Sequence, residues 1–558
     1  MTGIEALLEM LASAGVRYIF GNPGSTELAL NDALAGDARF QYILGLQEVP
    51  VVAMADGYAM ASGSVGVANV HIACGLGNAM GMMYNAHCAG TPLLLTAGQQ
   101  DRRLRIEEPV LMSDLVQVAR PWTKWSYEVQ RAQDVPVAVR RAVQTALTPP
   151  TGPVFLALPL DVQTESSDRF DLVPPHIPDR RVRPPREALQ QAAAILAGAQ
   201  HPAILAGSRV AESGGSAELA ALAERMGAAV YDESVTSHGR LPMATDHPCY
   251  AGSLPLWSPE IHQLLAGRDV LFAVGINLLR QYLYHEPERP LPADARLVQL
   301  DDHAWEIGKN YAVDVGLMGD PKMGLAELDS LLARVMTGEQ VAAANRRRAR
   351  LAEQRADERA RLEADLCRQR DRRPMTAATF MAAVGRVLPP HGAVVQEATT
   401  THQLLLERLG AIKDPGGYFA HRGWALGWGI GCALGVQLAW SERPVIGLLG
   451  DGAAVFGIQG LWTAARYQIP VAFVVANNAQ YKILKTCGDV LKLPHFAGRQ
   501  YLGMDLVQPE IDFVGLAQSF GMEADRIGDP DALSERLRAW RDNPRPLLLD
   551  VPIDREPR

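Results

Sequence analysis

Long apolar segments are absent from this sequence. None of its 558 residues belong to an apolar run that approaches the roughly 20 residues needed to span a bilayer. The N-terminus, Met1-Thr2-Gly3-Ile4-Glu5, also lacks the basic start of a signal peptide. We therefore expect a cytoplasmic protein with no membrane partner.

Basic residues are outnumbered by acidic residues, and cysteines are few. The chain has 53 Lys and Arg against 62 Asp and Glu, which gives a formal net charge of -9. This balance argues against a nucleic-acid partner, because a general nucleic-acid binder needs a basic face for the phosphates. The six cysteines show no metal-type spacing and are expected to be buried free thiols in a reducing cytoplasm.

The order of apolar segments predicts an α/β protein with three doubly wound parallel-sheet domains. Short β-branched and Leu-rich runs alternate with helical segments over residues 1–165, 186–335 and 375–555. A Pro- and Arg-rich connector separates the first two domains. Residues 340–373 link the second and third domains. Their interleaved Arg, Glu and Asp favour a solvated, ion-paired helix over an RNA-binding segment.

Strands are expected in each domain where an apolar run is bounded by turn residues. In the first domain they fall within residues 16–21, 40–46, 65–72, 91–98 and 152–159. In the second they fall within 201–207, 228–233, 269–275, 295–301 and 313–320. In the third they fall within 393–396, 443–450, 470–478 and 546–552. The first and third domains also share a weak internal similarity of glycine turn, small-residue helix and apolar strand.

The run from Gly450 to Asn478 carries the strongest chemical signal. Gly450-Asp451-Gly452 follows one predicted strand, and Asn477-Asn478 ends the next. Asp451 and Asn478 should therefore meet at the carboxyl edge of a parallel sheet, where ligands bind in open α/β proteins. Carboxylate and amide oxygens suit Mg²⁺ or Ca²⁺, and the glycines allow close approach of a diphosphate. The alternative is an ordinary turn that happens to hold these residues.

Gly450-Asp451-Gly452, 24 residues and then Asn477-Asn478 resemble the cofactor motif of thiamine-diphosphate-dependent enzymes. The resemblance implies thiamine diphosphate and Mg²⁺ as cofactors. It implies that the metal is held by Asp451, Asn478 and the main-chain carbonyl of Gln480. It also places Gly452, Ala453 and Tyr481 beside the diphosphate. Enzymes of this family build each active site from two chains, so the resemblance implies at least a homodimer and favours a homotetramer.

Glu48 is the candidate partner for the cofactor's aminopyrimidine ring. It follows the predicted strand at residues 40–46 and precedes a helix, and a desolvated carboxylate there tends to hold its proton. The spacing from Glu48 to Ala55-Asp56-Gly57-Tyr58-Ala59 resembles the family's glutamate region. In the family this acid shifts the ring to its imino form, which then removes the proton from the thiazolium. The alternative is a surface glutamate that caps the helix.

Two loops resemble benzoylformate decarboxylases more than other family members. They are Phe20 to Ser25 and His71 to Gly75. The resemblance implies that Ser25 binds the substrate carboxylate and that His71 relays protons. The alternatives are a turn serine and a satisfied core histidine.

The third domain supplies further candidate cofactor contacts. By resemblance, the hydroxyl groups of Thr399 and Thr400 bind diphosphate oxygens. Leu426 would lie beneath the thiazolium and pyrimidine rings and hold them together, although a large aliphatic residue there could also be core packing.

The sequence departs from benzoylformate decarboxylases in the substrate pocket. Their second active-site histidine falls within Arg280 to His285, where this chain has Tyr or Leu at the matching point. An aromatic pocket residue is replaced by Cys487, and a small one by Ile483. The pocket is therefore expected to be reshaped, and a phenyl-bearing substrate does not follow from the resemblance.

These observations predict non-oxidative decarboxylation of a benzoylformate-like 2-keto acid to an aldehyde and CO₂. The alternative within the family is a carboligase of the acetolactate synthase type, which joins two carbonyl compounds. A nicotinamide dehydrogenase is disfavoured because Gln99-Gln100, not an acid, follows the strand after Gly75-x-Gly77. A non-catalytic nucleotide-binding module is disfavoured by the joint presence of Glu48, His71 and the metal-type residues. Whether the central domain holds a flavin or a nucleotide stays open.

Overall fold

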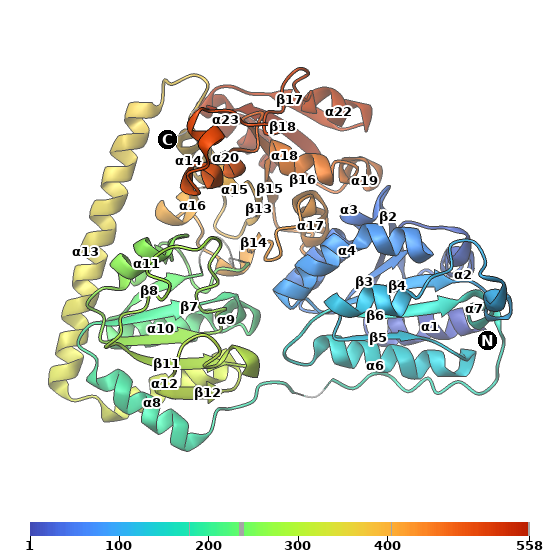
Figure 1. Ribbon diagram of the computed structural model, residues 1–558, viewed down its shortest axis with the longest axis horizontal. Helices are drawn as coiled ribbons and strands as arrows, with labels where there is room; N and C mark the ends of the chain where they lie inside the picture. Colours follow the sequence, from blue (N-terminus) through green and yellow to red (C-terminus); the bar gives the residue numbers. More distant parts are fainter. Residues whose placement is uncertain (178, 234–238, 403, 556–558) are drawn as a thin grey trace.

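The computed structural model describes residues 1–177, 179–233, 239–402 and 404–555. Within these residues the chain forms three six-stranded sheets with helices packed around them (Figure 1). In all three sheets, each strand runs parallel to the strands hydrogen-bonded beside it. The predicted fold class, α/β with three doubly wound parallel sheets, is therefore confirmed.

The N-terminal sheet has the strand order β2-β1-β3-β4-β6-β5. Its strands are β1 (Tyr18–Gly21), β2 (Gln41–Leu44), β3 (Gly66–Val70), β4 (Leu93–Gln99), β5 (Trp125–Glu128) and β6 (Val154–Pro159). Its helices are α1 (Gly3–Ser13), α2 (Leu28–Ala35), α3 (Glu48–Ser62), α4 (Ile72–Ala89), α5 (Leu115–Ala119), α6 (Val135–Leu147) and α7 (Leu160–Thr164).

The C-terminal sheet repeats this topology, with the order β14-β13-β15-β16-β18-β17. Its strands are β13 (Ala393–Glu397), β14 (Tyr418–Ala420), β15 (Val445–Gly450), β16 (Val471–Asn477), β17 (Glu523–Arg526) and β18 (Leu547–Pro552). Its helices are α14 (Ala377–Gly385), α15 (Thr399–His402), α16 (Leu405–Arg408), α17 (Trp428–Ala439), α18 (Asp451–Phe456), α19 (Gly460–Tyr467), α20 (Lys482–Val490), α21 (Pro494–Ala497), α22 (Phe513–Ser519) and α23 (Pro530–Asp542). The weak similarity expected between the first and third domains thus reflects one shared strand order.

The central sheet has the different order β12-β11-β10-β7-β8-β9. Its strands are β7 (Pro202–Ala206), β8 (Ala229–Asp232), β9 (Tyr250–Ser253), β10 (Val270–Val274), β11 (Arg296–Asp301) and β12 (Val315–Met318). Its helices are α8 (Arg186–Gly198), α9 (Ser208–Glu212), α10 (Ser216–Met226), α11 (Ser258–Leu265) and α12 (Pro321–Val335). The linking helix is α13 (Gly338–Gln369), which runs along one side of the molecule to the C-terminal domain (Figure 1).

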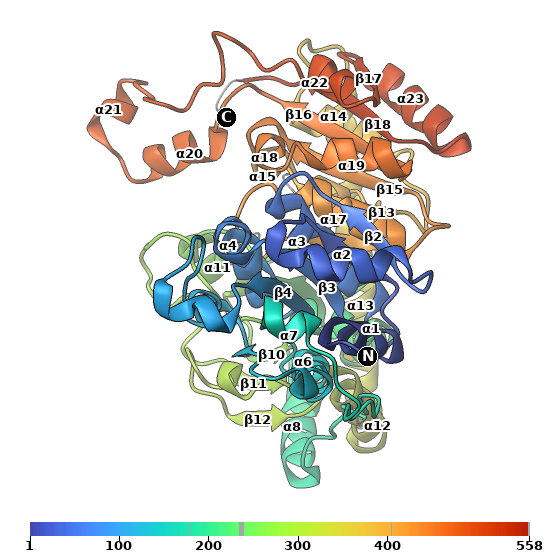
Figure 2. The same ribbon diagram turned by 90° about the vertical axis from the view of Figure 1, so that its right-hand side faces the viewer.

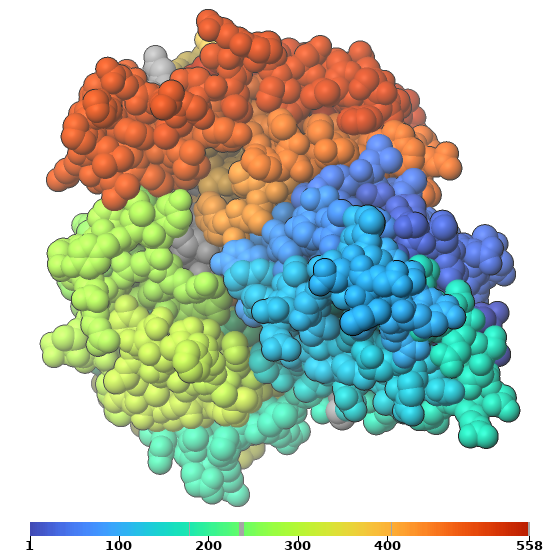
Figure 3. All heavy atoms as spheres, turned by 45° about the vertical axis from the view of Figure 1, so that its right-hand side comes forward, coloured from blue at the N-terminus to red at the C-terminus, as the bar shows by residue number. Residues whose placement is uncertain are grey.

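The N- and C-terminal sheets are joined through α3 and α17, which pack with their backbones in contact. Gly57 of α3 lies so close to Cys432 that a Cβ would sit 2.3 Å from its carbonyl oxygen. A Cβ on Gly435 of α17 would sit 2.0 Å from the carbonyl oxygen of Met54. Only glycine permits this approach, and the buried apolar side chains of both sheets form one continuous core around it. Figure 3 shows the N-terminal lobe in blue lying directly against the orange C-terminal lobe.

A buried polar contact marks the same junction. Trp428 of α17 donates its indole N–H to the Oδ2 atom of Asp56 on α3, at 2.6 Å. Asp56 is 1% exposed, and its Oδ1 atom has no hydrogen-bond partner among the described residues. Burial raises the pKa of Asp56 to about 6. The junction therefore contains a carboxylate that is poorly solvated when ionised.

Two sequence expectations concern the chain as a whole. None of the helices formed by the described residues is both long and apolar enough to cross a bilayer. All six cysteines are free, as expected. The expectation that they are buried was right for Cys249, Cys432 and Cys487 but wrong for the other three. Cys74 on α4 and Cys367 on α13 are exposed in this chain, and Cys88 on α4 is half-buried.

Candidate active site

Glu48 lies at the carboxyl end of β2, as the first residue of α3. It is 5% exposed, so it is not the surface glutamate of the alternative interpretation. Asn22 Nδ2 donates to Oε1 at 3.1 Å, and Asn78 Nδ2 donates to Oε2 at 3.0 Å. Gly75 lies beside it, and a Cβ there would be 3.0 Å from Oε1. Two amides therefore orient a buried carboxyl group from either side.

His71 lies between β3 and α4, next to the loop that carries Ser25. Its Nδ1 atom is 2.7 Å from Oε2 of Glu27, a residue that is 1% exposed. A Cβ on Gly24 would lie 2.0 Å from this Nδ1, so glycine is required where the loop passes the ring. The His71 side chain is 21% exposed and is therefore not a core histidine. Ser25 is exposed and begins a 3₁₀ turn whose other two residues, Thr26 and Glu27, are buried.

The C-terminal motif forms where two neighbouring strands end. Asp451 follows β15 as the first residue of α18, and Asn478 follows β16. The Oδ1 atom of Asp451 accepts from the N–H of Gly452 at 2.7 Å, while the buried Oδ2 has no hydrogen-bond partner among the described residues. Burial raises the pKa of Asp451 to about 6, although the N–H groups of residues 478–480 lie close enough to oppose this. The structure thus brings Asp451 and the turn after Asn478 together.

The turn after Asn478 has a strained backbone. Ala479 adopts φ +48°, in the left-handed region that non-glycine residues rarely occupy. The Asn477 and Asn478 side-chain oxygens accept from the N–H groups of Ala479 and Gln480, each at 3.1 Å. Tyr481 then packs against Gly452, where a Cβ would lie 2.4 Å from the ring. These contacts fix the direction of the Asn478 side chain and of the Gln480 backbone.

Leu426 lies in the loop between β14 and α17, and a buried acid holds the end of that loop. Glu397, at the end of β13, accepts from the N–H groups of Gly427, Trp428 and Gly429 at 2.8 to 3.0 Å. Burial raises the pKa of Glu397 to about 8, while these three N–H groups act to lower it. Thr399 and Thr400 follow Glu397 at the start of α15. The two threonines and Leu426 therefore lie around the same pair of strand ends.

The other end of this loop is held by the N-terminal domain. Asn85 of α4 donates to the carbonyl oxygen of Ala425 at 2.8 Å and accepts from the Ala425 N–H at 3.1 Å. Trp424 has φ +64°, a second strained non-glycine residue. Its ring stacks on Tyr282 of the central domain, with centroids 6.0 Å apart. The loop is thus fixed by contacts from all three domains.

The predicted site residues form two groups at the carboxyl edges of two sheets with the same topology. Ser25, Glu48 and His71 follow the adjacent strands β1, β2 and β3. The second group follows the adjacent strands β13, β15 and β16 or lies in the loop before α17: Thr399, Thr400, Leu426, Asp451, Gly452, Ala453, Asn478, Gln480 and Tyr481. Among the described residues, no hydrogen bond or ion pair links a member of one group to a member of the other.

The sequence matches three consecutive family descriptions. They are "Thiamine pyrophosphate enzyme, N-terminal TPP binding domain" over residues 1–117, the central domain over 189–328 and the C-terminal TPP binding domain over 398–551. Together they cover most of the chain. The chain belongs to the thiamine pyrophosphate enzyme family. The resemblance inferred from the motifs is thereby confirmed.

Relatives within the thiamine pyrophosphate enzyme family include both decarboxylases and synthases. The benzoylformate decarboxylase of Pseudomonas aeruginosa is 34% identical, with 98% of each chain covered. A probable acetolactate synthase large subunit of Methanocaldococcus jannaschii is 29% identical, with 99% of this chain and 92% of the relative covered. The 4-hydroxybenzoylformate decarboxylase of Rhodococcus jostii has a similar structure, with a TM-score of 0.86, 28% identity and full coverage of both chains.

The residues present fit the family's cofactor, thiamine pyrophosphate (thiamine diphosphate), and a divalent cation. The unpartnered, buried Oδ2 of Asp451 needs a positive or donating group, which a bound cation would supply. Together with the Asn478 amide and the Gln480 carbonyl, it forms the all-oxygen set that Mg²⁺ prefers. The cofactor would be held by the second group of residues at its diphosphate and by Glu48 at its pyrimidine ring.

Sequence reasoning missed the residues that orient this site. Asn22, Asn78 and Glu27 contact Glu48 or His71 through side chains 26 to 44 positions apart in the sequence. Asn85 and Glu397 hold the Leu426 loop. Asn22, Glu27, Asn78 and Glu397 lie within or close to motifs already singled out, but nothing in the sequence marked Asn85.

The structure also shows how the departures in the substrate pocket are arranged. Tyr282 and Cys487 interact through their side chains, and this contact contributes to the raised pKa of Tyr282 after burial. Cys487 and Ile483 lie on α20, which projects from the C-terminal sheet (Figure 2). The ring of His285 packs edge-on against Trp257, with centroids 5.0 Å apart, and Trp257 lies against Tyr282. An aromatic cluster therefore stands between the central domain and the Leu426 loop.

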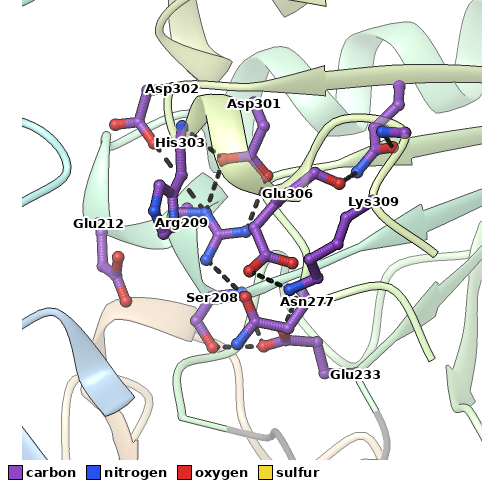
Figure 4. A network of polar contacts seen from close by, with 12 residues as sticks. Ser208, Arg209, Glu212, Glu233, Asn277, Asp301, Asp302, His303, Glu306 and Lys309 are labelled. Atoms are coloured by element: carbon purple, nitrogen blue, oxygen red, sulfur yellow. Dashed lines mark hydrogen bonds and ion pairs between the residues drawn. The ribbon is translucent and has the colours of Figure 1, made fainter. Parts of the chain in front are cut away.

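The open question of a flavin or nucleotide in the central domain concerns the switch point between β7 and β10 (Figure 4). There, the carboxylate of Glu233 accepts from the backbone N–H groups of Ser208 and Asn277, at 3.1 and 3.0 Å. Arg209 binds both oxygens of Asp301, at 2.8 and 2.7 Å. Glu233 and Asp301 are thus both engaged by groups of the chain itself at this switch point.

Proposed function

We propose that this protein is a thiamine diphosphate- and Mg²⁺-dependent decarboxylase that converts a 2-keto acid to an aldehyde and CO₂. The family supplies the cofactor class, and the position of His71 supports the reaction. His71 is held at Nδ1 beside Ser25 and follows β3, which β1 separates from β2, the strand that leads into Glu48. This position at the same sheet edge suits proton delivery to a substrate carbon. Benzoylformate and its analogues are the first candidate substrates, by similarity to the relatives.

When bound, the cofactor supplies a carbon nucleophile and an electron sink for the loss of CO₂. Glu48, oriented by Asn22 and Asn78, would hold a proton at the pyrimidine nitrogen. Ser25 would donate its hydroxyl hydrogen to the substrate carboxylate. The Nε2 atom of His71 would carry the proton that replaces CO₂.

By similarity to the family, whose members build each active site from two chains, we propose a homodimer as the minimum active unit and a homotetramer as the favoured form. Each chain would supply the Glu48 group to one site and the Asp451 group to the other. The two groups lie on the edges of separate sheets.

A carboligase of the acetolactate synthase type is the second candidate. The relatives of that type align with nearly the whole chain, and Tyr282 and Cys487 replace groups of the decarboxylase pocket. The two reactions share the loss of CO₂ and differ in what the remaining carbon receives. A proton gives the aldehyde, and a second carbonyl compound gives a C–C bond.

The proposal is tested by supplying the purified protein with thiamine diphosphate, Mg²⁺ and a panel of aromatic and aliphatic 2-keto acids. CO₂ and organic products are measured with and without an acceptor aldehyde. We expect CO₂ with an equal amount of aldehyde from at least one substrate. Products that contain a new C–C bond even without an added acceptor would favour the carboligase. No CO₂ from any substrate would reject the decarboxylase assignment.

Glu48→Gln tests whether Glu48 is the partner of the cofactor's pyrimidine ring, because the amide keeps the shape of the side chain and removes its ionisable group. We expect turnover to fall by at least about 10³-fold with the fold intact, since the ring can no longer be activated. Undiminished turnover would remove Glu48 from this role. Circular dichroism and thermal unfolding check that the variant is folded.

A further inference from the structure

The buried carboxylate of Glu27 has its two oxygens in different environments. Oε1 accepts from three donors: the N–H of Gly98 at 2.7 Å, the Thr26 hydroxyl at 2.8 Å and the N–H of Ile72 at 3.3 Å. Oε2 faces the Nδ1 atom of His71 at 2.7 Å. With Glu27 ionised, both of its oxygens only accept, which assigns the hydrogen between Glu27 and His71 to Nδ1.

The surroundings make this arrangement rigid. Ile72, a β-branched residue, is held at φ +28°, where such residues are strained. The strain allows its N–H to point at Glu27 while His71 ends the loop before α4. The Thr26 oxygen also lies 3.3 Å from Nδ1 and, having given its hydrogen to Glu27, can only accept there. Two acceptors thus face the same ring nitrogen.

We propose that Glu27 is a positioning residue that locks His71 with its hydrogen on Nδ1, so that Nε2 alone gains and loses a proton. This inference rests on the proposed function. In each turnover Nε2–H gives its proton to the carbon that has lost CO₂, and Nε2 takes one back from solvent. The N–H bond at Nδ1 neither forms nor breaks. Without the lock, the neutral ring can place its hydrogen on Nε2 and leave Nδ1 to take the next proton.

Glu27→Gln inverts the lock without changing the shape of the side chain. The three donors around Oε1 will select the amide oxygen, which turns the amide NH₂ group towards Nδ1. His71 must then accept at Nδ1 and carry its hydrogen on Nε2. The neutral ring cannot give up that proton near neutral pH, because an imidazolate anion would result, and it cannot hold a second proton while Nδ1 faces a donor. We expect kcat to fall by about 10²-fold or more, with KM changed less than about threefold.

The test measures kcat, KM and the product ratio for the wild type, Glu27→Gln, His71→Ala and the double variant, all as holoenzyme. If Glu27 acts through His71, the double variant is no slower than His71→Ala, within about twofold. Both single variants should also form a larger fraction of the C–C bonded product when acceptor aldehyde is present, because the substrate carbon that has lost CO₂ is protonated slowly. Asp168→Asn serves as the control, since this side chain is 96% exposed, and it should leave kcat and the product ratio unchanged.

The outcomes separate the inference from the function it rests on. Glu27→Gln within about fivefold of wild type, with His71→Ala impaired, overturns the positioning role and leaves the decarboxylase proposal standing. Losses that multiply in the double variant, or an unchanged product ratio, show a merely structural role and also overturn it. An undiminished His71→Ala overturns the positioning role of Glu27 and removes His71 from the reaction, whereas the absence of CO₂ from every substrate overturns the decarboxylase proposal. If Glu27→Gln does not fold, Glu27→Asp replaces it. The shorter side chain moves the carboxylate away from His71, which should raise the fraction of C–C bonded product. An unchanged fraction overturns the inference.

Discussion

Replacing Asp56 with asparagine tests the energetics of the junction between α3 and α17. Burial raises the pKa of Asp56 from 3.8 to about 6 in the folded protein. An acid with a raised folded pKa binds its proton more tightly when folded. Its contribution to stability is therefore fully present below pH 3.8 and is lost as the pH rises through about 6. A shift of about two pKa units corresponds to about 3 kcal/mol at neutral pH and above.

In the Asp56→Asn variant, the amide oxygen would still accept the indole N–H of Trp428, but the side chain cannot ionise. Any change that the amide NH₂ group makes in its contact with the neighbouring Thr91 hydroxyl does not depend on pH. The difference in free energy of unfolding between the variant and the wild type therefore changes with pH only through the ionisation of Asp56. From the two pKa values, that difference should shift in favour of Asp56→Asn by about 1.4 kcal/mol between about pH 5 and pH 8.

Urea unfolding followed by tryptophan fluorescence, at both pH values, measures this difference. Other titrating groups cancel because they are common to both proteins. Asp168→Asn is the control, since this side chain is 96% exposed and should give no pH-dependent difference. A difference for Asp56→Asn that stays constant with pH, or that shifts in favour of the wild type at high pH, would refute the reasoning.

Two further substitutions follow from backbone geometry. Gly435→Ala should lower the thermal midpoint and the activity, because a Cβ would meet the carbonyl oxygen of Met54 at 2.0 Å and overpacking costs about 1–3 kcal/mol. Gly198→Ala is the control, because open space surrounds Gly198, and it should show no loss in either quantity. Trp424→Gly should fold normally, since glycine accepts φ +64° without strain, and should raise kcat/KM for bulky 2-keto acids over short ones by about tenfold; an unchanged preference would place Trp424 outside the substrate pocket.

The sequence predicted the inner strands of all three sheets but not four of the outer ones. The strands missed were β5, β9, β14 and β17, and each lies at the edge of its sheet. Inner parallel strands are buried on both faces and appear as continuous apolar runs. An edge strand such as β17, with the sequence Glu-Ala-Asp-Arg, has exposed positions and is short, so apolar periodicity cannot reveal it.

The same limit explains which parts of the site were predictable. The carboxyl ends of parallel strands meet at one edge, so residues that follow strands could be grouped before any coordinates were known. Glu48 and Asp451 are of this kind. The partners Asn22 and Glu27 are not, because their roles arise from contacts across distant segments, and Asn and Glu in a loop are otherwise unremarkable. Strain at Ile72 and Ala479 likewise appears only in the folded backbone.

The close pairing of α3 with α17 has a consequence for the order of synthesis. Helix α3 is apolar on nearly all sides, and its face around Gly57 packs against α17 of the C-terminal domain. The ribosome makes α17 several hundred residues later. At typical elongation rates of about 5–20 residues per second, α3 must wait for roughly 20 to 70 seconds. A nascent chain of this protein therefore exposes an apolar helix through most of its translation. Binding by a chaperone would cover this helix until α17 has been synthesised.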